Sequence, residues 1–377
     1  MTPSKTNRQS SIELYKIIAI ILIIISHVTQ TLCPIESTAV FADYMINIQA
    51  ASQDVQHFFL RQFSYFGMLG NAMFFIASAW FLCDSQRIKW KRWWGIVIDV
   101  WIISVFILVV SLIFGCKMSA KFIIFQFLPN TLANNWYITC YLLFYPLHPV
   151  LNKIWSEMSQ KVHLSTSVVL VFLYVLCNFV SQSLFFFSNL ILWIAIYFTT
   201  AYIKRYMIDY QKNTKKNLVI LLIAIVCQVL LVAGTNWVQL KTSFNIGSQF
   251  RWRNNSNPFI LLIAISLFLL FKEWKFNSSI VNSLSSQSLL IYILHENMVI
   301  RTFLRPLIWE YIFINIGYQY VVLIDLGVSI SFFIVCLGIA YLYSFSLRKL
   351  VQYLGNIIGR WVLNCCRRIG NIIANWK

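Results

Sequence analysis

The segment SIELYKIIAIILIIISHVTQTL, residues 11–32, is apolar over most of its length but carries Glu13, Lys16 and His27. A helix of this length is long enough to cross the hydrocarbon core of a bilayer. His27 follows Lys16 by about three helical turns, or about 16 Å of rise, so both side chains lie on one face at different depths. Ionisable side chains within a membrane are costly and usually functional. We therefore expect this helix to carry part of a functional site.

The rest of the chain has the composition of a protein whose solvent is a lipid bilayer. Of its 377 residues, 59% are hydrophobic, 17% are aromatic and only 11% are charged, and apolar runs recur from one end to the other. This composition excludes an ordinary soluble domain. The first apolar run follows a basic N-terminus, but it is longer than a signal-peptide core and has no small-residue cleavage site. We expect a retained helix.

Apolar runs near twenty residues predict an all-α polytopic integral membrane protein with about ten transmembrane helices. The expected spans are residues 12–32, 64–83, 93–115, 136–152, 166–181, 184–203, 218–235, 258–271, 284–303 and 318–346. The sequence has no convincing repeat, glycine-rich phosphate loop or GxSxG motif. The simplest organisation is a cytoplasmic tail at 1–11, a transmembrane domain at 12–346 and a basic amphipathic cytoplasmic tail at 347–377.

The distribution of Lys and Arg predicts the orientation, because cytoplasmic loops carry an excess of these residues. With both termini in the cytoplasm, the expected inner segments hold 21 of the 30 Lys and Arg residues, the outer side holds eight, and Lys16 lies within the first span. The formal net charge of +18 then indicates orientation and attraction to anionic membrane lipid. We expect no nucleic-acid partner. We expect a multi-pass protein of the bacterial cytoplasmic membrane, and the sequence leaves its oligomeric state open.

The nine cysteines do not predict a metal centre. They are scattered without a CxxC motif or a Cys/His spacing typical of zinc, haem or an iron–sulfur cluster. We therefore expect neither a metal ion nor a bound cofactor.

Four segments, in order and spread over most of the expected spans, carry a family resemblance. They are IELYKIIAIILIIISHV (12–28), NAMFFIASAWFL (71–82), NNWYITCYLLFYPLHPVLN (134–152) and SLLIYILHENMVIR (288–301). They resemble the membrane-bound acyltransferase-3 family, whose members O-acylate cell-surface carbohydrates. This chain departs from the family pattern at two positions, because it has Lys16 where arginine is usual and Ala79 where glycine is usual.

The resemblance implies an enzyme that takes an acyl group, commonly acetyl, from acetyl-CoA and delivers it to a carbohydrate hydroxyl. The acceptor would be a surface polysaccharide, a glycolipid or a lipid-linked saccharide. His27 would act as general base on the acceptor hydroxyl, since imidazole titrates near neutral pH. Lys16 would meet the nucleotide phosphates of the donor, with Glu13 in a supporting role through an i,i+3 ion pair. Alternatively, His27 makes a polar helix contact and Lys16 extends to the membrane surface.

Further candidate residues lie in the other segments. We expect Arg87 and Arg92 to bind donor phosphate, because they stand in a basic loop rich in tryptophan. On the acceptor side we expect Trp136 and Tyr141 to stack on a sugar. We expect Tyr292, His295 and Glu296 to form a polar helix face beside the acceptor. Each group also has a purely structural interpretation, as the basic and aromatic residues usual at a membrane interface or as a cluster of polar residues that packs between helices.

Two other classes of protein fit parts of the pattern. A carrier or flippase for a lipid-linked saccharide is also polytopic and basic, with a few charges inside the membrane. It does not account for the four family-like segments. A non-catalytic sensor or scaffold that retains the fold is the other alternative, and the departures at Lys16 and Ala79 keep it open.

Overall fold

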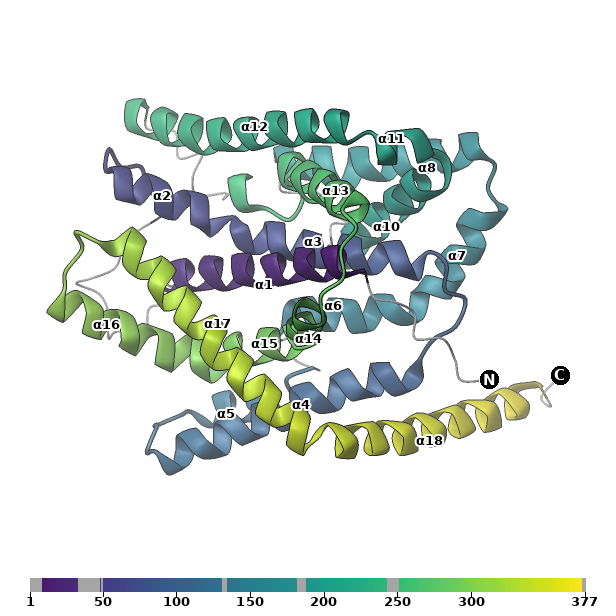
Figure 1. Ribbon diagram of the computed structural model, residues 1–377. Coiled ribbons are helices and arrows are strands. Elements are labelled where there is room, and N and C mark those ends of the chain that lie inside the picture. The colour runs from purple at the N-terminus through teal and green to yellow at the C-terminus, as the bar shows by residue number, and fades with distance from the viewer. Residues whose placement is uncertain are drawn as a thin grey trace.

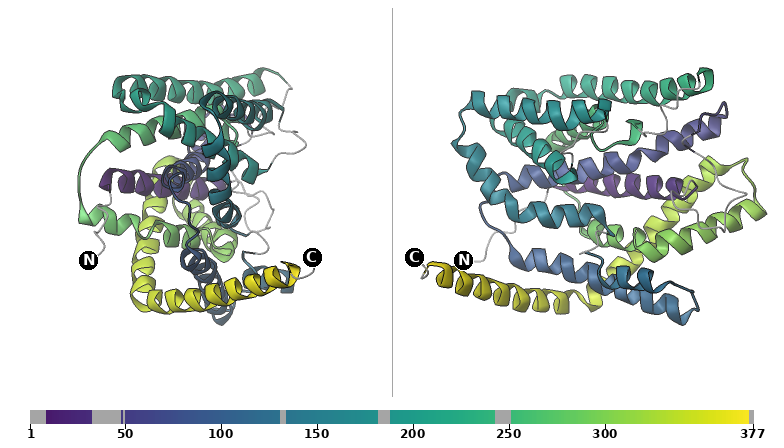
Figure 2. Two further views of the ribbon diagram at one scale, coloured as in Figure 1. Left: turned by 90° about the vertical axis from the view of Figure 1, so that its right-hand side faces the viewer. Right: turned by 180° about the vertical axis from the view of Figure 1, so that it is seen from behind.

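The computed structural model describes residues 9–32, 48, 50–130, 134–181, 188–242 and 251–374. Within these ranges the ordered elements are helices and there is no strand. Most of the longer helices run along one common direction, and α17 crosses them diagonally (Figure 1). Figure 2 shows the same bundle close to end-on and from behind.

The described residues form a series of α-helices. Their bounds are α1 Ser10–Thr31, α2 Val55–Ser64, α3 Phe66–Leu82, α4 Trp90–Ile113, α5 Ala120–Phe127, α6 Trp136–Phe144, α7 His148–Glu157, α8 Gln160–Val171, α9 Asn178–Ser181, α10 Asn189–Tyr206, α11 Ile208–Lys212, α12 Thr214–Lys241, α13 Pro258–Glu273, α14 Ser279–Ser285, α15 Ser288–His295, α16 Arg305–Asn315, α17 Val321–Ser346 and α18 Arg348–Ala374.

Six helical stretches in the described part of the chain are long and apolar enough to cross a membrane. They are Ser10–Thr31, Val55–Leu82, Trp90–Ile113, Gln160–Val180, Thr214–Lys241 and Val321–Ser346. The all-helical class is therefore confirmed, while the count of ten spans stays a prediction. The expected span at 284–303 is not one continuous helix, because it contains α14, α15 and a π-helical turn at Ile300–Leu304. Such breaks are tolerated at membrane depth where protein surrounds the backbone.

Helix α1 lies at the centre of the packing. It contacts α3 most extensively and also packs against α2 and the helices from α13 to α17. The approach of α1 to α3 is close at Gly70, where an added Cβ would lie 2.4 Å from the Ala19 carbonyl oxygen and 2.6 Å from Ile23 Cγ1. Because α3 runs antiparallel to α1, its last turn lies toward the Ser10 end of the bundle.

The C-terminal helix α18 packs along α4. Two glycines one turn apart form the contact. An added Cβ at Gly355 would lie 3.3 Å from the Lys91 carbonyl oxygen, and one at Gly359 would lie 3.3 Å from Trp94 Cδ1. Small residues at this spacing allow two helix backbones to approach each other. Tyr353 and Trp361 of α18 are exposed.

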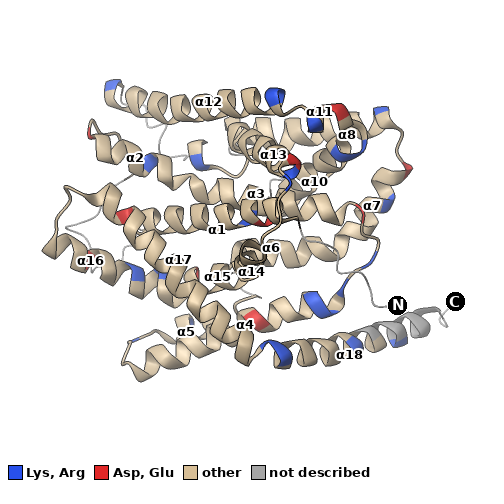
Figure 3. Ribbon diagram, in the orientation of Figure 1, with Lys and Arg blue, Asp and Glu red and all other residues tan. Residues whose placement is uncertain are grey.

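Basic residues occur at both ends of the bundle, but more of them lie toward the end that carries Ser10 and the C-terminal end of α18 (Figure 3). We call these the Ser10 end and, opposite to it, the Thr31 end. The placement of the Ser10 end in the cytoplasm stays a prediction from the charge distribution.

Candidate active site

Two histidines and a carboxylate from opposite ends of the chain meet inside the bundle. Nδ1 of His27, near the end of α1, lies 2.7 Å from Oε2 of Glu296, which directly follows α15. The same nitrogen lies 3.1 Å from Nε2 of His295, and the two imidazole rings stack with centroids 5.3 Å apart. His295 and Glu296 are buried and His27 is nearly so, with 10% of its side chain exposed.

The hydrogen bonds around these rings assign the proton positions. Nδ1 of His295 lies 2.8 Å from the Ile291 carbonyl oxygen, which only accepts, so this nitrogen carries the hydrogen. In the neutral ring, Nε2 of His295 is then an acceptor. Because His27 Nδ1 faces both this acceptor and the carboxylate of Glu296, it must be the donor. In the neutral ring of His27, the lone pair therefore lies on Nε2, where it can accept a proton.

The carboxylate of Glu296 is fixed by two arginines. Nη1 of Arg301 lies 3.3 Å from Oε1, and Nη2 of Arg305 lies 3.2 Å from Oε2. Arg305 is buried, with 2% exposure. Paired charges of this kind keep a buried carboxylate ionised, and hydrogen bonds fix its direction. Glu296 can therefore orient His27 and stabilise the imidazolium that forms when Nε2 is protonated. Arg305 was not among the residues singled out from the sequence.

The free nitrogen of His27 faces a position without a side chain. An added Cβ on Gly67, in the first turn of α3, would lie 3.8 Å from His27 Nε2 and 2.8 Å from Ser26 Oγ. Ser26 donates to the Ser64 carbonyl oxygen at 2.8 Å and accepts from Gln30 at 2.8 Å. Glycine at this position thus lets the start of α3 pack closely against α1 beside the nitrogen that would accept the proton.

Aromatic rings line the α15 side of the cluster. Tyr292 packs edge-on against His295, with centroids 5.5 Å apart, and its hydroxyl is buried without a hydrogen-bond partner in the structure. Tyr137 of α6 contacts Tyr292 at 5.6 Å. The expected stacking residues of α6 lie elsewhere, since Trp136 contacts Tyr137 and Tyr141 contacts Tyr145. Tyr137 is thus the α6 ring that reaches the cluster, and the sequence prediction missed it.

Glu13 and Lys16 lie at the other end of α1. Their side chains form an ion pair at 2.7 Å, and Ser285 Oγ donates to Glu13 Oε2 at 2.5 Å. Glu13 is therefore positioned to hold Lys16, about three to four helical turns away from His27. The acid that contacts His27 is Glu296 instead.

Arg87 and Arg92 are exposed at the Ser10 end, in the link before α4 and in its first turn. The start of α4 packs on α6, where Trp93 Nε1 donates to the Leu142 carbonyl oxygen at 2.8 Å. The structure thus places these two arginines beside α6 rather than within the cluster around His27.

The three ligand atoms of His27, His295 and Glu296 lie within 4.8 Å of one another, which is close enough to hold a metal ion. However, His27 Nδ1, both nitrogens of His295 and both carboxylate oxygens of Glu296 already have hydrogen-bond partners. A metal ion would have to replace the proton on His27 Nδ1 and compete with Arg301 and Arg305 for the carboxylate. The donor set therefore fits proton transfer better than metal binding.

Comparison with known proteins identifies the family of the chain. Residues 9–349 match a family model described as an acyltransferase domain. No curated protein and no solved structure shows a significant match to the chain. The matched region contains α1, α15 and the whole cluster around His27. The chain therefore belongs to the acyltransferase-3 family, and it is a membrane acyltransferase.

Proposed function

We propose that this protein transfers an acyl group, specifically acetyl, from acyl-CoA to a hydroxyl of a cell-surface polysaccharide, a glycolipid or a lipid-linked saccharide. The observation that carries the proposal is the contact between His27 Nδ1 and Glu296, which leaves Nε2 of His27 as a base. A hydroxyl must lose its proton to attack a thioester, and a correctly oriented imidazole supplies the acceptor for that proton.

The reaction proceeds by direct transfer. The acceptor oxygen attacks the thioester carbonyl carbon while His27 Nε2 removes the hydroxyl proton. The new C–O bond forms, the C–S bond breaks, and the departing thiolate takes the proton from His27 to give free CoA thiol. Glu296 stays ionised and stabilises the imidazolium between these two proton transfers, which is how a carboxylate assists a catalytic histidine in hydrolases.

The donor enters from the cytoplasm at the Ser10 end of α1. Lys16 meets the phosphates there, with help from Arg87 and Arg92 at the same end of the bundle. The extended pantetheine arm then reaches along α1, since about 16 Å separates Lys16 from His27 along the helix.

The acceptor sugar is bound at the Thr31 end. The buried hydroxyl of Tyr292 has no partner in the structure and is a donor for a sugar oxygen. Tyr137, which packs against Tyr292, supplies aromatic surface from α6, with the ring of Trp136 next to it.

Acetyl transfer from radiolabelled acetyl-CoA to cell-surface carbohydrate tests the proposal, in membranes that contain the wild type or His27→Ala. We expect label with the wild type and a loss of about 10²–10⁴-fold in the variant, because a general base contributes that much. His163→Ala is the control, because His163 is a buried histidine that contacts the Phe198 carbonyl oxygen in another part of the bundle. Unchanged turnover in folded His27→Ala protein would remove the general-base role. A wild type without activity on native glycan would exclude acetyl-CoA as donor.

A further inference from the structure

Two lysines from different helices converge on one tryptophan at the Ser10 end of the bundle. Nζ of Lys204, in the last turn of α10, lies 5.0 Å from the ring centroid of Trp80, and Nζ of Lys272, in the last turn of α13, lies 5.5 Å from it. Helix C-termini favour cations, which accounts for one lysine in the last turn of α10 and one in the last turn of α13. It does not account for two ammonium groups that share one indole. We call Trp80, Lys204 and Lys272 the lysine clamp.

The acids beside the clamp leave part of its hydrogen-bonding capacity unused. Lys204 Nζ contacts Asp84 Oδ2 at 2.6 Å and the Trp80 carbonyl oxygen at 2.5 Å, and Lys272 Nζ contacts Glu273 Oε1 at 2.5 Å. An ammonium group has three N–H donors, so within the described residues the two lysines retain donors for a further acceptor. The side chain of Asp84 is 73% exposed, so its ion pair with Lys204 is weak and replaceable.

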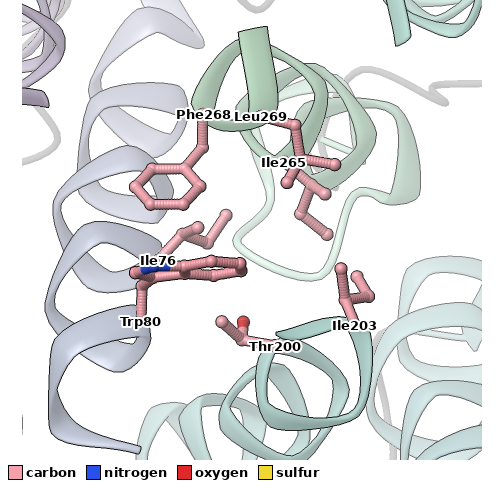
Figure 4. Close-up of a pocket in the computed structure, with 7 residues that line it drawn as sticks. All are labelled: Ile76, Trp80, Thr200, Ile203, Ile265, Phe268 and Leu269. Carbon is pink, nitrogen blue, oxygen red and sulfur yellow. The ribbon is translucent and has the colours of Figure 1, made fainter. Parts of the chain in front are cut away.

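A small apolar cavity lies behind the clamp. It is enclosed by α3, α10 and α13, and Trp80 and Thr200 face into it (Figure 4). Its lining residues are Ile76, Trp80, Thr200, Ile203, Ile265, Phe268 and Leu269. The ring of Trp80 thus lies near both ammonium groups and also lines this apolar cavity. The two ammonium groups suit a ligand that carries phosphates, as the nucleotide part of CoA does.

The clamp connects to the helix that carries the catalytic histidine. The ring of Phe268 contacts Trp80 at 5.2 Å and Tyr15 of α1 at 5.5 Å. Tyr15 directly precedes Lys16 in the chain. A donor whose phosphates lie on the clamp would thus begin beside the start of α1, from which its arm extends toward His27.

We propose that Lys204 and Lys272, held on the ring of Trp80, bind the phosphate groups of the nucleotide part of acyl-CoA. This inference rests on the proposed function and names a donor site that the sequence prediction did not include. Asp84 forms an ion pair with Lys204 when the donor is absent, and a phosphate group of the donor displaces it.

Steady-state kinetics with two donors test the clamp. Acetyl-CoA carries the phosphates, whereas S-acetyl-pantetheine has the same thioester without them. In Lys204→Gln and Lys272→Gln we expect KM for acetyl-CoA to rise about tenfold or more, because a charge-assisted contact is lost. We expect kcat/KM for S-acetyl-pantetheine to stay unchanged. Lys272→Arg should keep the KM for acetyl-CoA close to that of the wild type, because the charge is retained. Asp84→Asn should lower the KM for acetyl-CoA, because a competing anion is removed.

Lys275→Gln is the matched control, since Lys275 is exposed and three residues beyond Lys272. Lys275→Gln removes one positive charge from the link that follows α13 and should leave the kinetics with both donors unchanged. If Lys204→Gln and Lys272→Gln bind acetyl-CoA as the wild type does, or if both donors weaken equally, the clamp does not bind phosphate.

Equilibrium binding of radiolabelled CoA separates this proposal from the proposed function. A wild type that binds CoA but transfers nothing would contradict the proposed function, while weaker CoA binding by the two variants would still support the clamp. A wild type that does not bind CoA would overturn both. Size-exclusion profiles and thermal midpoints of each variant exclude misfolding as the cause.

Discussion

Oε2 of Glu296 lies 2.7 Å from Nδ1 of His27, although the two residues belong to opposite ends of the chain. The contact joins α1 to the end of α15, and it sets which imidazole nitrogen is free. Because Glu296 is itself held by the exposed Arg301 and the buried Arg305, the direction of the histidine ring depends on a chain of charged groups. Catalysis should therefore depend on residues that do not contact either substrate.

Glu296→Gln should lower kcat by about 10²–10⁴-fold with little change in KM for the acyl donor, because the variant loses the charge that stabilises the imidazolium. Initial rates over a range of donor concentrations measure this split. Glu296→Asp should recover part of kcat because it keeps the charge. Glu310→Gln, on α16, is the control and should resemble the wild type. A normal kcat in Glu296→Gln would show that the contact is only structural.

Lys16→Gln should raise KM for acetyl-CoA about tenfold, since one charge-assisted contact with phosphate is lost. Lys16→Arg should keep activity, because its charge and reach are retained and the pair with Glu13 can form. Donor titrations of the three proteins check both expectations. An inactive but folded Lys16→Arg would show that lysine at this position is not equivalent to the arginine usual in the family.

Asp325→Asn should leave transfer and thermal stability close to the wild type. The Thr29 hydroxyl lies 2.8 Å from both the Ile25 carbonyl oxygen and Asp325 Oδ2, yet it has one hydrogen to donate. Both contacts are hydrogen bonds only when the Asp325 carboxyl supplies the second proton. Oδ1 of Asp325 is buried without a partner, which also favours the neutral acid. Transfer rate and thermal midpoint measure the effect, and a large loss of transfer in folded Asp325→Asn would instead indicate that Asp325 moves a proton or a charge.

Gly70→Ala should destabilise the protein by about 1–3 kcal/mol, because the added methyl group would meet the backbone of Ala19 and force α1 and α3 apart. The same movement would displace His27 from Gly67 and lower transfer. Thermal unfolding in detergent, followed by intrinsic fluorescence, measures the loss. Gly338→Ala is the matched control, because nothing lies within 4 Å of a Cβ added there. Equal midpoints for the two variants would mean that the helices can separate without loss.

The sequence predicts the first helix well, because an apolar run with three ionisable residues has few other interpretations. The all-helical class follows from the long apolar runs that recur along the chain, because a helix satisfies its own backbone hydrogen bonds in a membrane. The pairing of Glu296 with His27 was beyond sequence reasoning, since nothing local specifies how His27 aligns with a segment whose His295 lies 268 residues further along the chain. The spacing of Glu296, Arg301 and Arg305 was a usable signal for a charged cluster. The lysine clamp had no such signal, because its three members come from three helices.

The packing of Gly355 and Gly359 on α4 bears on where the protein can be shortened. The family match ends at residue 349, in the first turn of α18, but the rest of this helix covers the backbone of Lys91 and the ring of Trp94. A protein cut at that boundary would leave this stretch of α4 bare, next to the basic link that holds Arg87. The C-terminal extension is therefore part of the folded unit, and a tag or truncation placed by the family boundary alone would disturb the donor end of the molecule.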